Sequence, residues 1–212
     1  MARPGLVRWC GRALAAGGLL TFLLNATLTP LMVAKAPLEQ TAASTVFVFR
    51  QSLAILVAAL LLLGTIGLYS AQSERAGVLG GIAFVIAVLG SALLLAWEWI
   101  NVFLIRELAL RAPAAVRTLE TAKGLSMYDL GALIPITLFS IGWIVLEVST
   151  LRAWEPGRRP AIAVIAGFFL IPILSAAFGV IWGGVAGNAV LGFGWFFQGR
   201  ALAKERTGEG QS

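Results

Sequence analysis

The residues of this chain that could do chemistry are a few charged side chains within apolar stretches, and Glu98 is the most distinctive of them. It lies between Trp97 and Trp99, near the end of the long apolar stretch 77–105. A carboxylate in such a stretch is costly to hold away from water, and ionisable residues of this kind commonly bind a substrate, an ion or a proton. Glu98 is therefore the first candidate for a functional site.

Arg50 is the expected partner of Glu98. The two residues flank a polar segment, 70–76, which we expect to form a tight turn, and they are about equally far from its centre along the sequence. In two antiparallel helices with a rise of about 1.5 Å per residue they would lie at nearly the same height, at the outer edge of a membrane. A charge costs less at that depth, where tryptophans also concentrate. We expect a structural ion pair, with a transport or proton-binding site as the alternative.

Three further polar residues fall within apolar stretches, namely Asn25, Glu147 and Asn188. Glu147 precedes a basic turn at 152–160, so we expect the arginines of that turn to neutralise its carboxylate. Buried asparagines ordinarily form hydrogen bonds between membrane helices, worth about 1 kcal/mol each. A substrate site would require several of these residues to converge with Glu98.

The chain lacks the residues that most enzyme mechanisms require. The chain has no histidine, the commonest metal ligand and proton shuttle, and Cys10 is its single cysteine. A phosphate-binding loop with its lysine is also absent from the sequence. We therefore predict a protein that is not an enzyme and that holds no metal or cofactor.

The composition indicates which elements must position these residues. Hydrophobic residues make up 59% of the 212 residues and charged residues 12%, whereas soluble domains have roughly 45–50% and 25%. The apolar blocks are long enough to cross a hydrocarbon core of about 30 Å as helices. We predict an all-α transmembrane bundle of about six spans, at 13–33, 51–69, 77–105, 127–150, 161–178 and 183–198. The charged segment 106–125 should rest at the membrane interface, and 203–212 should form a polar tail.

Glycines mark the break between the last two spans. The apolar stretch 161–197 is too long for one span and is expected to break between 179 and 184. Gly179, Gly183 and Gly187 form two overlapping GxxxG repeats in this region. Such a repeat serves either the flexibility of a turn or the close packing of two helices, and both roles stay open here.

Charged residues at the ends of the spans predict the topology. The basic residues before position 13 and the apolar run after it have the shape of a signal peptide, but the apolar character continues to 33, so we expect a retained span. Ser126 and Asp129 form a capping-box pattern at the start of the fourth span. With six spans, ten basic residues fall on the side of both termini and six on the other, which predicts cytoplasmic termini. An odd number of spans is the alternative.

Segments of glycine and tryptophan within apolar runs carry a family resemblance. They cover 69–80, 97–104, 138–143 and 191–202. With these segments the chain resembles small uncharacterised bacterial integral membrane proteins of six helices. The resemblance implies a bundle of packed helices in the cell inner membrane, and it implies no activity or functional residue.

Our leading expectation for function is a non-enzymatic multi-pass membrane protein, either an accessory or structural subunit of a membrane complex or a free-standing bundle. The net charge of +6 comes from basic residues that flank apolar blocks, so the expected partners are the lipid bilayer and other membrane subunits, not nucleic acid. The oligomeric state is left open. The alternative is a small-molecule or ion transporter, which would need an enclosed polar cavity lined by Asn25, Glu98, Glu147 or Asn188.

Overall fold

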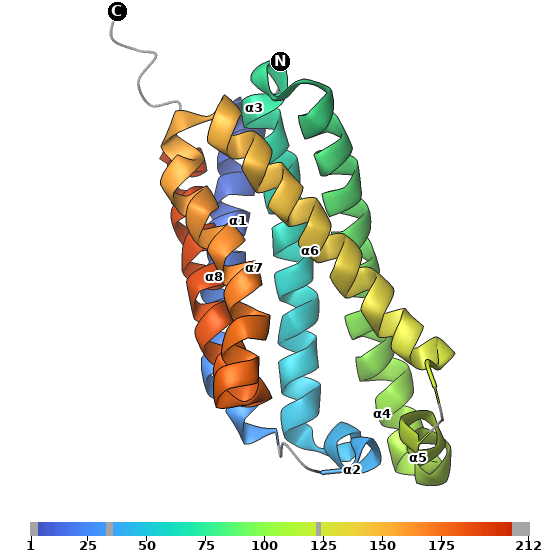
Figure 1. The fold of residues 1–212 in the computed structure, drawn as a ribbon. Coiled ribbons are helices and arrows are strands. Elements are labelled where there is room, and N and C mark those ends of the chain that lie inside the picture. Colours follow the sequence, from blue (N-terminus) through green and yellow to red (C-terminus); the bar gives the residue numbers. More distant parts are fainter. Residues whose placement is uncertain (1–3, 33–35, 122–123, 205–212) are drawn as a thin grey trace, which may run out of the picture.

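The computed structural model describes residues 4–32, 36–121 and 124–204, and this part consists of helices and short connections, without a β-strand (Figure 1). Five of the described helical segments are long and apolar enough to cross a membrane. The long helices are α1 (Pro4–Thr27), α3 (Thr45–Ile100), α6 (Met127–Ala153), α7 (Arg158–Phe178) and α8 (Val180–Lys204). The predicted all-α fold is confirmed for the described residues, and the five segments have the length and apolarity expected of membrane-spanning helices.

Helix α3 consists of two antiparallel legs, because the chain reverses at Gly77 (Figure 1). Gly77 has φ 59° and ψ −161°, a conformation that glycine adopts readily and other residues do not. Tyr69 on the first leg stacks on Phe84 on the second, with ring centroids 4.4 Å apart. The predicted turn over 70–76 is wrong, since these residues are helical and the reversal takes a single residue. Alanine, glutamine, glutamate and arginine in this segment favour helix, which explains why the first leg continues to the glycine.

Helices α1 and α8 pack backbone against backbone through glycines spaced seven residues apart, Gly11 and Gly18 on α1 and Gly192 and Gly199 on α8. A Cβ atom on Gly18 would lie 2.5 Å from the carbonyl oxygen of Gly192, and one on Gly199 would lie 2.3 Å from the nitrogen of Ala15. Small residues allow membrane helices this close approach. The start of α1 meets the end of α8, so the two helices are antiparallel and the described chain ends lie at the same end of the bundle (Figure 1).

The turn between α7 and α8 is the single residue Gly179, with φ 84°. Gly183 and Gly187 are helical and face α7 at close range. A Cβ atom on Gly183 would lie 2.1 Å from the nitrogen of Ser175, and one on Gly187 would lie 2.7 Å from the nitrogen of Ile171. Both roles considered for the glycine repeat therefore occur, at different residues: Gly179 forms the turn, and Gly183 and Gly187 allow the close packing of α7 and α8.

Several helix ends differ from the predicted spans, because hydropathy detects the apolar part of a helix and misses polar turns that continue it. Helices α1, α7 and α8 begin before the predicted spans 13–33, 161–178 and 183–198, and α6 and α8 continue beyond the predicted ends at 150 and 198. Helix α1 instead ends at Thr27, before the predicted end at 33. The capping box that starts α6 is confirmed, since Ser126 Oγ accepts a hydrogen bond from the Asp129 nitrogen at 3.1 Å and Asp129 Oδ2 accepts one from the Ser126 nitrogen at 2.9 Å. Of the predicted tail, 205–212 lies outside the described residues, as does position 33 of the first span.

A small helical cap lies at the end of the bundle opposite the described chain ends (Figure 1). It consists of α2 (Leu38–Ala43), α4 (Arg106–Arg111) and α5 (Pro113–Thr121), and a π-helix at Asn101–Ile105 leads into α4. Val116 of α5 is fully buried against Ala42 of α2 and the residues around it. The segment 106–125 was predicted as an interfacial loop, but within its described part it is helical over α4 and α5; 122–123 lie outside the described residues.

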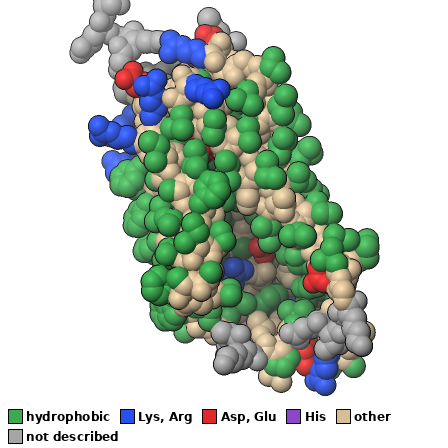
Figure 2. Space-filling model, in the orientation of Figure 1, with side chains coloured by type: hydrophobic (Ala, Val, Ile, Leu, Met, Phe, Trp, Pro, Cys, Tyr) green, Lys and Arg blue, Asp and Glu red, His purple; other side chains and the backbone are tan. Residues whose placement is uncertain are grey.

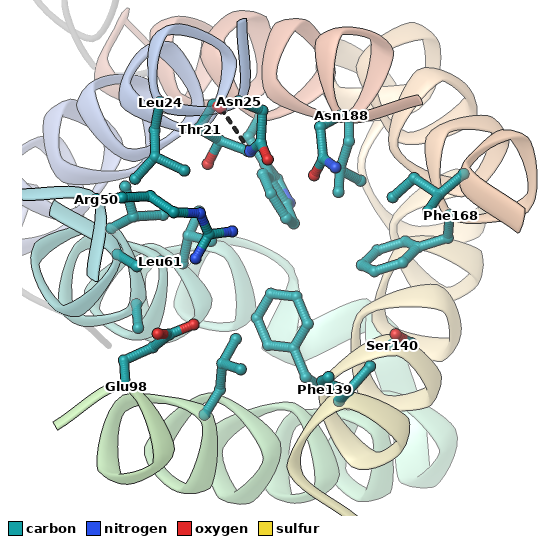
Figure 3. Close-up of a pocket in the computed structure, with 18 of the residues that line it drawn as sticks. Thr21, Leu24, Asn25, Arg50, Leu61, Glu98, Phe139, Ser140, Phe168 and Asn188 are labelled. Carbon is teal, nitrogen blue, oxygen red and sulfur yellow. Dashed lines mark hydrogen bonds between the residues drawn. The ribbon is translucent and has the colours of Figure 1, made fainter. Parts of the chain in front are cut away.

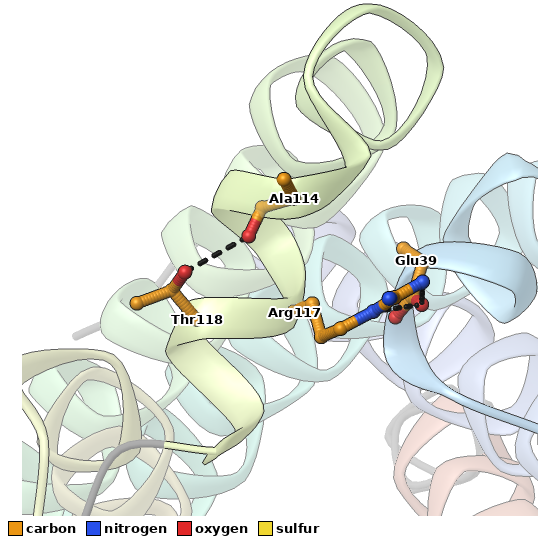
Figure 4. A network of polar contacts seen from close by, with 4 residues as sticks. All are labelled: Glu39, Ala114, Arg117 and Thr118. Carbon is orange, nitrogen blue, oxygen red and sulfur yellow. Dashed lines mark hydrogen bonds and ion pairs between the residues drawn. The ribbon is translucent and has the colours of Figure 1, made fainter.

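Glu39 on α2 and Arg117 on α5 hold the cap together (Figure 4). Arg117 Nε and Nη2 lie 2.9 and 2.7 Å from the same oxygen, Oε1 of Glu39. The backbone hydrogen bond of Glu39 and the guanidinium of Arg117 lower the pKa of the Glu39 carboxyl, against the opposing effect of its burial. The carboxylate is therefore charged at neutral pH and fastens α2 to α5.

An aromatic cluster joins α6, α7 and α8 inside the bundle. It consists of Phe139 and Trp143 from α6, Phe168 from α7 and Trp195 from α8. The rings of Trp143 and Trp195 meet edge to face with centroids 5.1 Å apart, and those of Phe139 and Phe168 do so at 5.9 Å. Both tryptophans are fully buried. Such contacts fix the three helices relative to one another and form one wall of the cavity described next.

Candidate functional site

A cavity of about 500 Å³ lies between α1, α3, α6, α7 and α8. Most of its lining is apolar, and its polar residues are Thr21, Asn25, Arg50, Glu98, Ser140 and Asn188. Figure 2 shows the surface of the bundle hollowed between α7 and α6, with basic and acidic side chains inside the hollow. A cavity of this size accommodates a small organic molecule. Three of the four residues that a transporter was expected to need therefore line one cavity.

Arg50 and Glu98 reach the cavity from the two legs of α3, at the end of the bundle that carries the cap. Arg50 lies in the second turn of the first leg, whose start is capped by Ser44: the Ser44 hydroxyl accepts a hydrogen bond from the Phe47 nitrogen at 3.2 Å. Glu98 lies near the end of the second leg. Because the legs are antiparallel about Gly77, the two side chains come to similar heights and point into the same space (Figure 3).

Gln51 joins the two charges. Among the ion pairs of the described residues, none brings Arg50 and Glu98 within 4.0 Å of each other. Instead, Gln51 Nε2 donates a hydrogen bond to Glu98 Oε2 at 2.6 Å, and Arg50 Nη1 donates one to Gln51 Oε1. Arg50 Nε also lies 3.5 Å from Thr29 Oγ1. The expected direct ion pair is replaced by a hydrogen-bonded chain, Arg50–Gln51–Glu98.

Sequence reasoning missed Gln51, because it was taken as the first residue of an apolar span. Gln51 is 5% exposed, so its amide is placed among protein groups and has to find its hydrogen bonds there. The available signal was a polar residue beside Arg50 at the expected height of Glu98. A glutamine can accept from a guanidinium and donate to a carboxylate at the same time.

Asn25 and Asn188 lie across the cavity from Glu98 (Figure 3). Each donates its amide nitrogen to a carbonyl of its own helix four residues earlier, Asn25 to Thr21 at 2.9 Å and Asn188 to Gly184 at 2.8 Å. The expected hydrogen bonds between helices are therefore not the ones that these nitrogens form. Their amides instead present polar groups to the cavity.

The aromatic cluster forms the apolar wall of the cavity. The rings of Phe139 and Phe168 point into it (Figure 3). Trp195, 1% exposed, meets both rings edge to face with centroids 6.0 Å apart. The charged groups and the aromatic rings thus come from different helices, Arg50 and Glu98 from α3 and the rings from α6, α7 and α8. A ligand that fits this arrangement has a polar part and an apolar part.

Glu147 lies outside the cavity, one helical turn beyond Trp143 on α6. It is fully buried, its Oε2 accepts a hydrogen bond from Gln198 Nε2 at 2.6 Å, and its Oε1 has no partner among the described residues. The expected neutralisation by the arginines of 152–160 is replaced by this amide contact, since Glu147 faces α8 inside the bundle. Arg158, by contrast, donates to a backbone carbonyl at the helix end.

The cavity is equipped for binding. It offers a guanidinium, a carboxylate, two amides and two hydroxyls, and these groups form hydrogen bonds and charge contacts. No three histidine, cysteine, aspartate or glutamate side chains come together as a metal site in the described ranges. The arrangement therefore suits the recognition of a molecule with charged or polar groups.

Comparisons with family models, with curated proteins and with solved structures found no significant match for this chain.

Proposed function

We propose that this protein crosses the membrane six times and carries a small molecule by way of the cavity between its helices. The observation that supports a carrier best is the convergence of Arg50, Glu98, Asn25 and Asn188 on one open cavity of about 500 Å³. Charged residues are rare inside membrane proteins, and where they face a cavity they commonly mark a substrate pathway. A bundle with a purely structural role needs no cavity beside its charged residues, so we favour the carrier over the structural subunit.

Six crossings follow if each leg of α3 spans the membrane, which its length allows. The five helical segments of sufficient length and apolarity include α3 as one segment, and the reversal at Gly77 divides it into two. An even number of crossings agrees with the two described chain ends lying at the same end of the bundle (Figure 1). We assign that end to the cytoplasm, because basic residues gather there, among them Arg8, Arg158, Arg159 and Lys204.

The carrier proposal predicts that water and small solutes reach the cavity. The test is the rate of N-ethylmaleimide labelling of a cysteine placed at Ser140, a lining residue, in a Cys10→Ala background. Two matched controls lie on the same helix: Ile141, 47% exposed on the outer face, and Leu146, fully buried. Maleimide reacts with the thiolate, which forms in a hydrated cavity and is suppressed in hydrocarbon or in a packed core.

We expect Ser140→Cys to react at least about tenfold faster than Ile141→Cys and Leu146→Cys, because only the first thiol can ionise in water. Equal rates at 140 and 141 would mean that the cavity is not hydrated and would contradict the carrier proposal. Faster reaction at Leu146→Cys than at Ser140→Cys would point to unfolding of the variants, which far-UV circular dichroism and size-exclusion elution identify.

A further inference from the structure

The polar groups of the cavity have hydrogen-bonding capacity that the protein itself does not use. Within the described part of the chain, Arg50 Nη2, Glu98 Oε1 and Asn188 Oδ1 take part in no hydrogen bond, whereas the neighbouring atoms of the same groups do. A guanidinium has five N–H donors and a carboxylate has about four acceptor positions, so both groups can bind a ligand and keep their contacts to Gln51. Both point into the cavity (Figure 3).

The orientation of the Gln51 amide shows which end of a polar group lies towards each of the two charged residues. Its oxygen accepts from Arg50 and its nitrogen donates to Glu98, at 2.6 Å for the latter bond. A ligand in the cavity beside Arg50 and Glu98 meets the same field, which attracts a negative oxygen towards Arg50 and a positive nitrogen towards Glu98. The amide is neutral, so a molecule that carries full charges of the same polarity would interact more strongly.

Charge balance restricts the ligand further. Arg50 and Glu98 are the two charged residues in the described lining, and their formal charges cancel. A ligand with only a negative or only a positive group would leave one net charge in a mainly apolar cavity, which is costly. A zwitterion pairs with both residues and leaves the cavity neutral.

The remaining lining determines the rest of the ligand. Phe139, Phe168 and Trp195 offer an aromatic wall opposite the charged side, and the total volume of about 500 Å³ exceeds what a zwitterionic head alone would fill. An apolar body of the ligand would bury its surface against this wall, at about 25 cal/mol per Å² removed from water. The hollow between α7 and α6 leads sideways out of the bundle, so the apolar body can extend in that direction (Figure 2).

We propose that the cavity binds a zwitterion with an apolar body, whose anionic group pairs with Arg50, whose ammonium group pairs with Glu98, and whose body packs against Phe139 and Phe168. This inference rests on the carrier proposal and names its substrate class. The same chemistry is offered by free apolar amino acids and by lipids with an aminophosphate headgroup. The experiment therefore has one arm for each source.

The first arm compares three molecules that differ only in their charged groups: L-phenylalanine, 3-phenylpropionate, which lacks the ammonium group, and 2-phenylethylamine, which lacks the carboxylate. Binding to the purified full-length protein in detergent is measured by equilibrium dialysis. The second arm uses 1-lauroyl-lysophosphatidylethanolamine, with 1-lauroyl-lysophosphatidylglycerol as the analogue without the ammonium group. We expect the zwitterion of at least one arm to bind about tenfold or more tightly than its analogues, the value of one lost charge-assisted contact.

Two variants assign the contacts. Glu98→Gln should make the zwitterion and its ammonium-free analogue bind equally, and Arg50→Ala should make L-phenylalanine and 2-phenylethylamine bind equally. Ile141→Ala, on the outer face of α6 and outside the cavity lining, should retain the preference for the zwitterion. The analogue series on the unmodified protein remains decisive even if a charge variant fails to fold.

Three results would overturn the proposal. One is equal binding of a zwitterion and its single-charge analogues by the unmodified protein, and a second is a preference for zwitterions that survives Glu98→Gln. The third is no zwitterion binding in either arm while the cysteine at 140 is still labelled faster than its controls. In that last case the carrier proposal stands with a different substrate class, whereas loss of the labelling itself would remove the carrier proposal.

Discussion

Replacing Gly199 by alanine should separate α1 and α8, which pack backbone against backbone. The added Cβ atom would lie 2.3 Å from the nitrogen of Ala15 and 2.5 Å from the carbonyl oxygen of Gly11, whereas ordinary contact begins at 3.4 Å. Both obstacles are backbone atoms, so no side-chain rotation relieves them. The helices α1 and α8 must move apart by about 1 Å or deform, and overpacking of this kind typically costs about 1–3 kcal/mol.

Gly184→Ala is the matched control on the same helix. No heavy atom that would obstruct a Cβ atom lies within 4 Å of that position. Alanine there gains the helix propensity that glycine lacks, up to about 1 kcal/mol, and meets no clash. Gly199→Ala has the same propensity gain but a larger packing loss. The two variants should therefore differ in unfolding free energy by about 1–3 kcal/mol, with Gly184→Ala the more stable.

Thermal unfolding in detergent, followed by tryptophan fluorescence, measures the difference. For a chain of this size about 2–4 °C in Tm corresponds to 1 kcal/mol, so Gly199→Ala should melt about 2–12 °C below Gly184→Ala. Equal melting temperatures, or a higher one for Gly199→Ala, would refute the close backbone contact between α1 and α8.

Three further outcomes follow from the same packing and polar contacts. Gln198→Leu should lower the unfolding free energy by about 1–3 kcal/mol in a denaturant titration, because the buried carboxyl of Glu147 loses the hydrogen bond that Gln198 donates. Adding Glu147→Leu should recover part of this loss. If the losses of the two substitutions simply add, the two side chains are not in contact. Because the pKa of Glu39 is lowered, its bond to Arg117 stabilises the cap fully above pH 4.5, the ordinary pKa of the carboxyl, and this stabilisation is lost as the pH falls from there through the lowered pKa of the folded protein. Hydrogen exchange of α5, corrected for the intrinsic exchange rate, should therefore accelerate in the parent protein as the pH falls below 4.5. In Arg117→Ala it should be fast already at neutral pH. Unchanged protection in both cases would show that this bond does not hold α5 to α2. Trp195→Ala should cost about 3–5 kcal/mol, since the ring is 1% exposed among other aromatic rings, and a loss below 1 kcal/mol would show that the cluster is loosely packed.

Much of the architecture could be predicted from the sequence, because crossing a membrane leaves a strong hydropathy signal. The long apolar stretches, the start of a leg at Gly77 and the matching heights of Arg50 and Glu98 all depend on positions along a helix axis. Those positions follow from counting residues at a fixed rise. The reversal at Gly179 could be predicted for the same reason, since one helix cannot contain the whole apolar stretch.

Contacts around the helix axis could not be predicted in the same way. These helices are apolar on nearly all sides, so no period in the sequence indicates which face meets which neighbour. Gln198 as the partner of Glu147 and Gln51 between two charges are therefore visible only in three dimensions. The spacing of seven residues between glycines on α1 and on α8 is a sequence signal for close packing of these two helices. Sequence reasoning missed it, because the GxxxG repeat at 179–187 is the more familiar pattern.

The measurement that tests the carrier most directly is the sidedness of access to the cavity. Trp195 of the aromatic cluster lies beside Gly18, about one helical turn nearer the assigned cytoplasmic end than the lining residue Thr21, so a carrier with access from both sides would have to open the cluster during its cycle. A membrane-impermeant methanethiosulfonate is added to right-side-out and to inside-out vesicles that contain Ser140→Cys in the Cys10→Ala background. The carrier proposal predicts modification in both preparations. Modification in only one of them would contradict it, because the cavity would then communicate with a single side of the membrane.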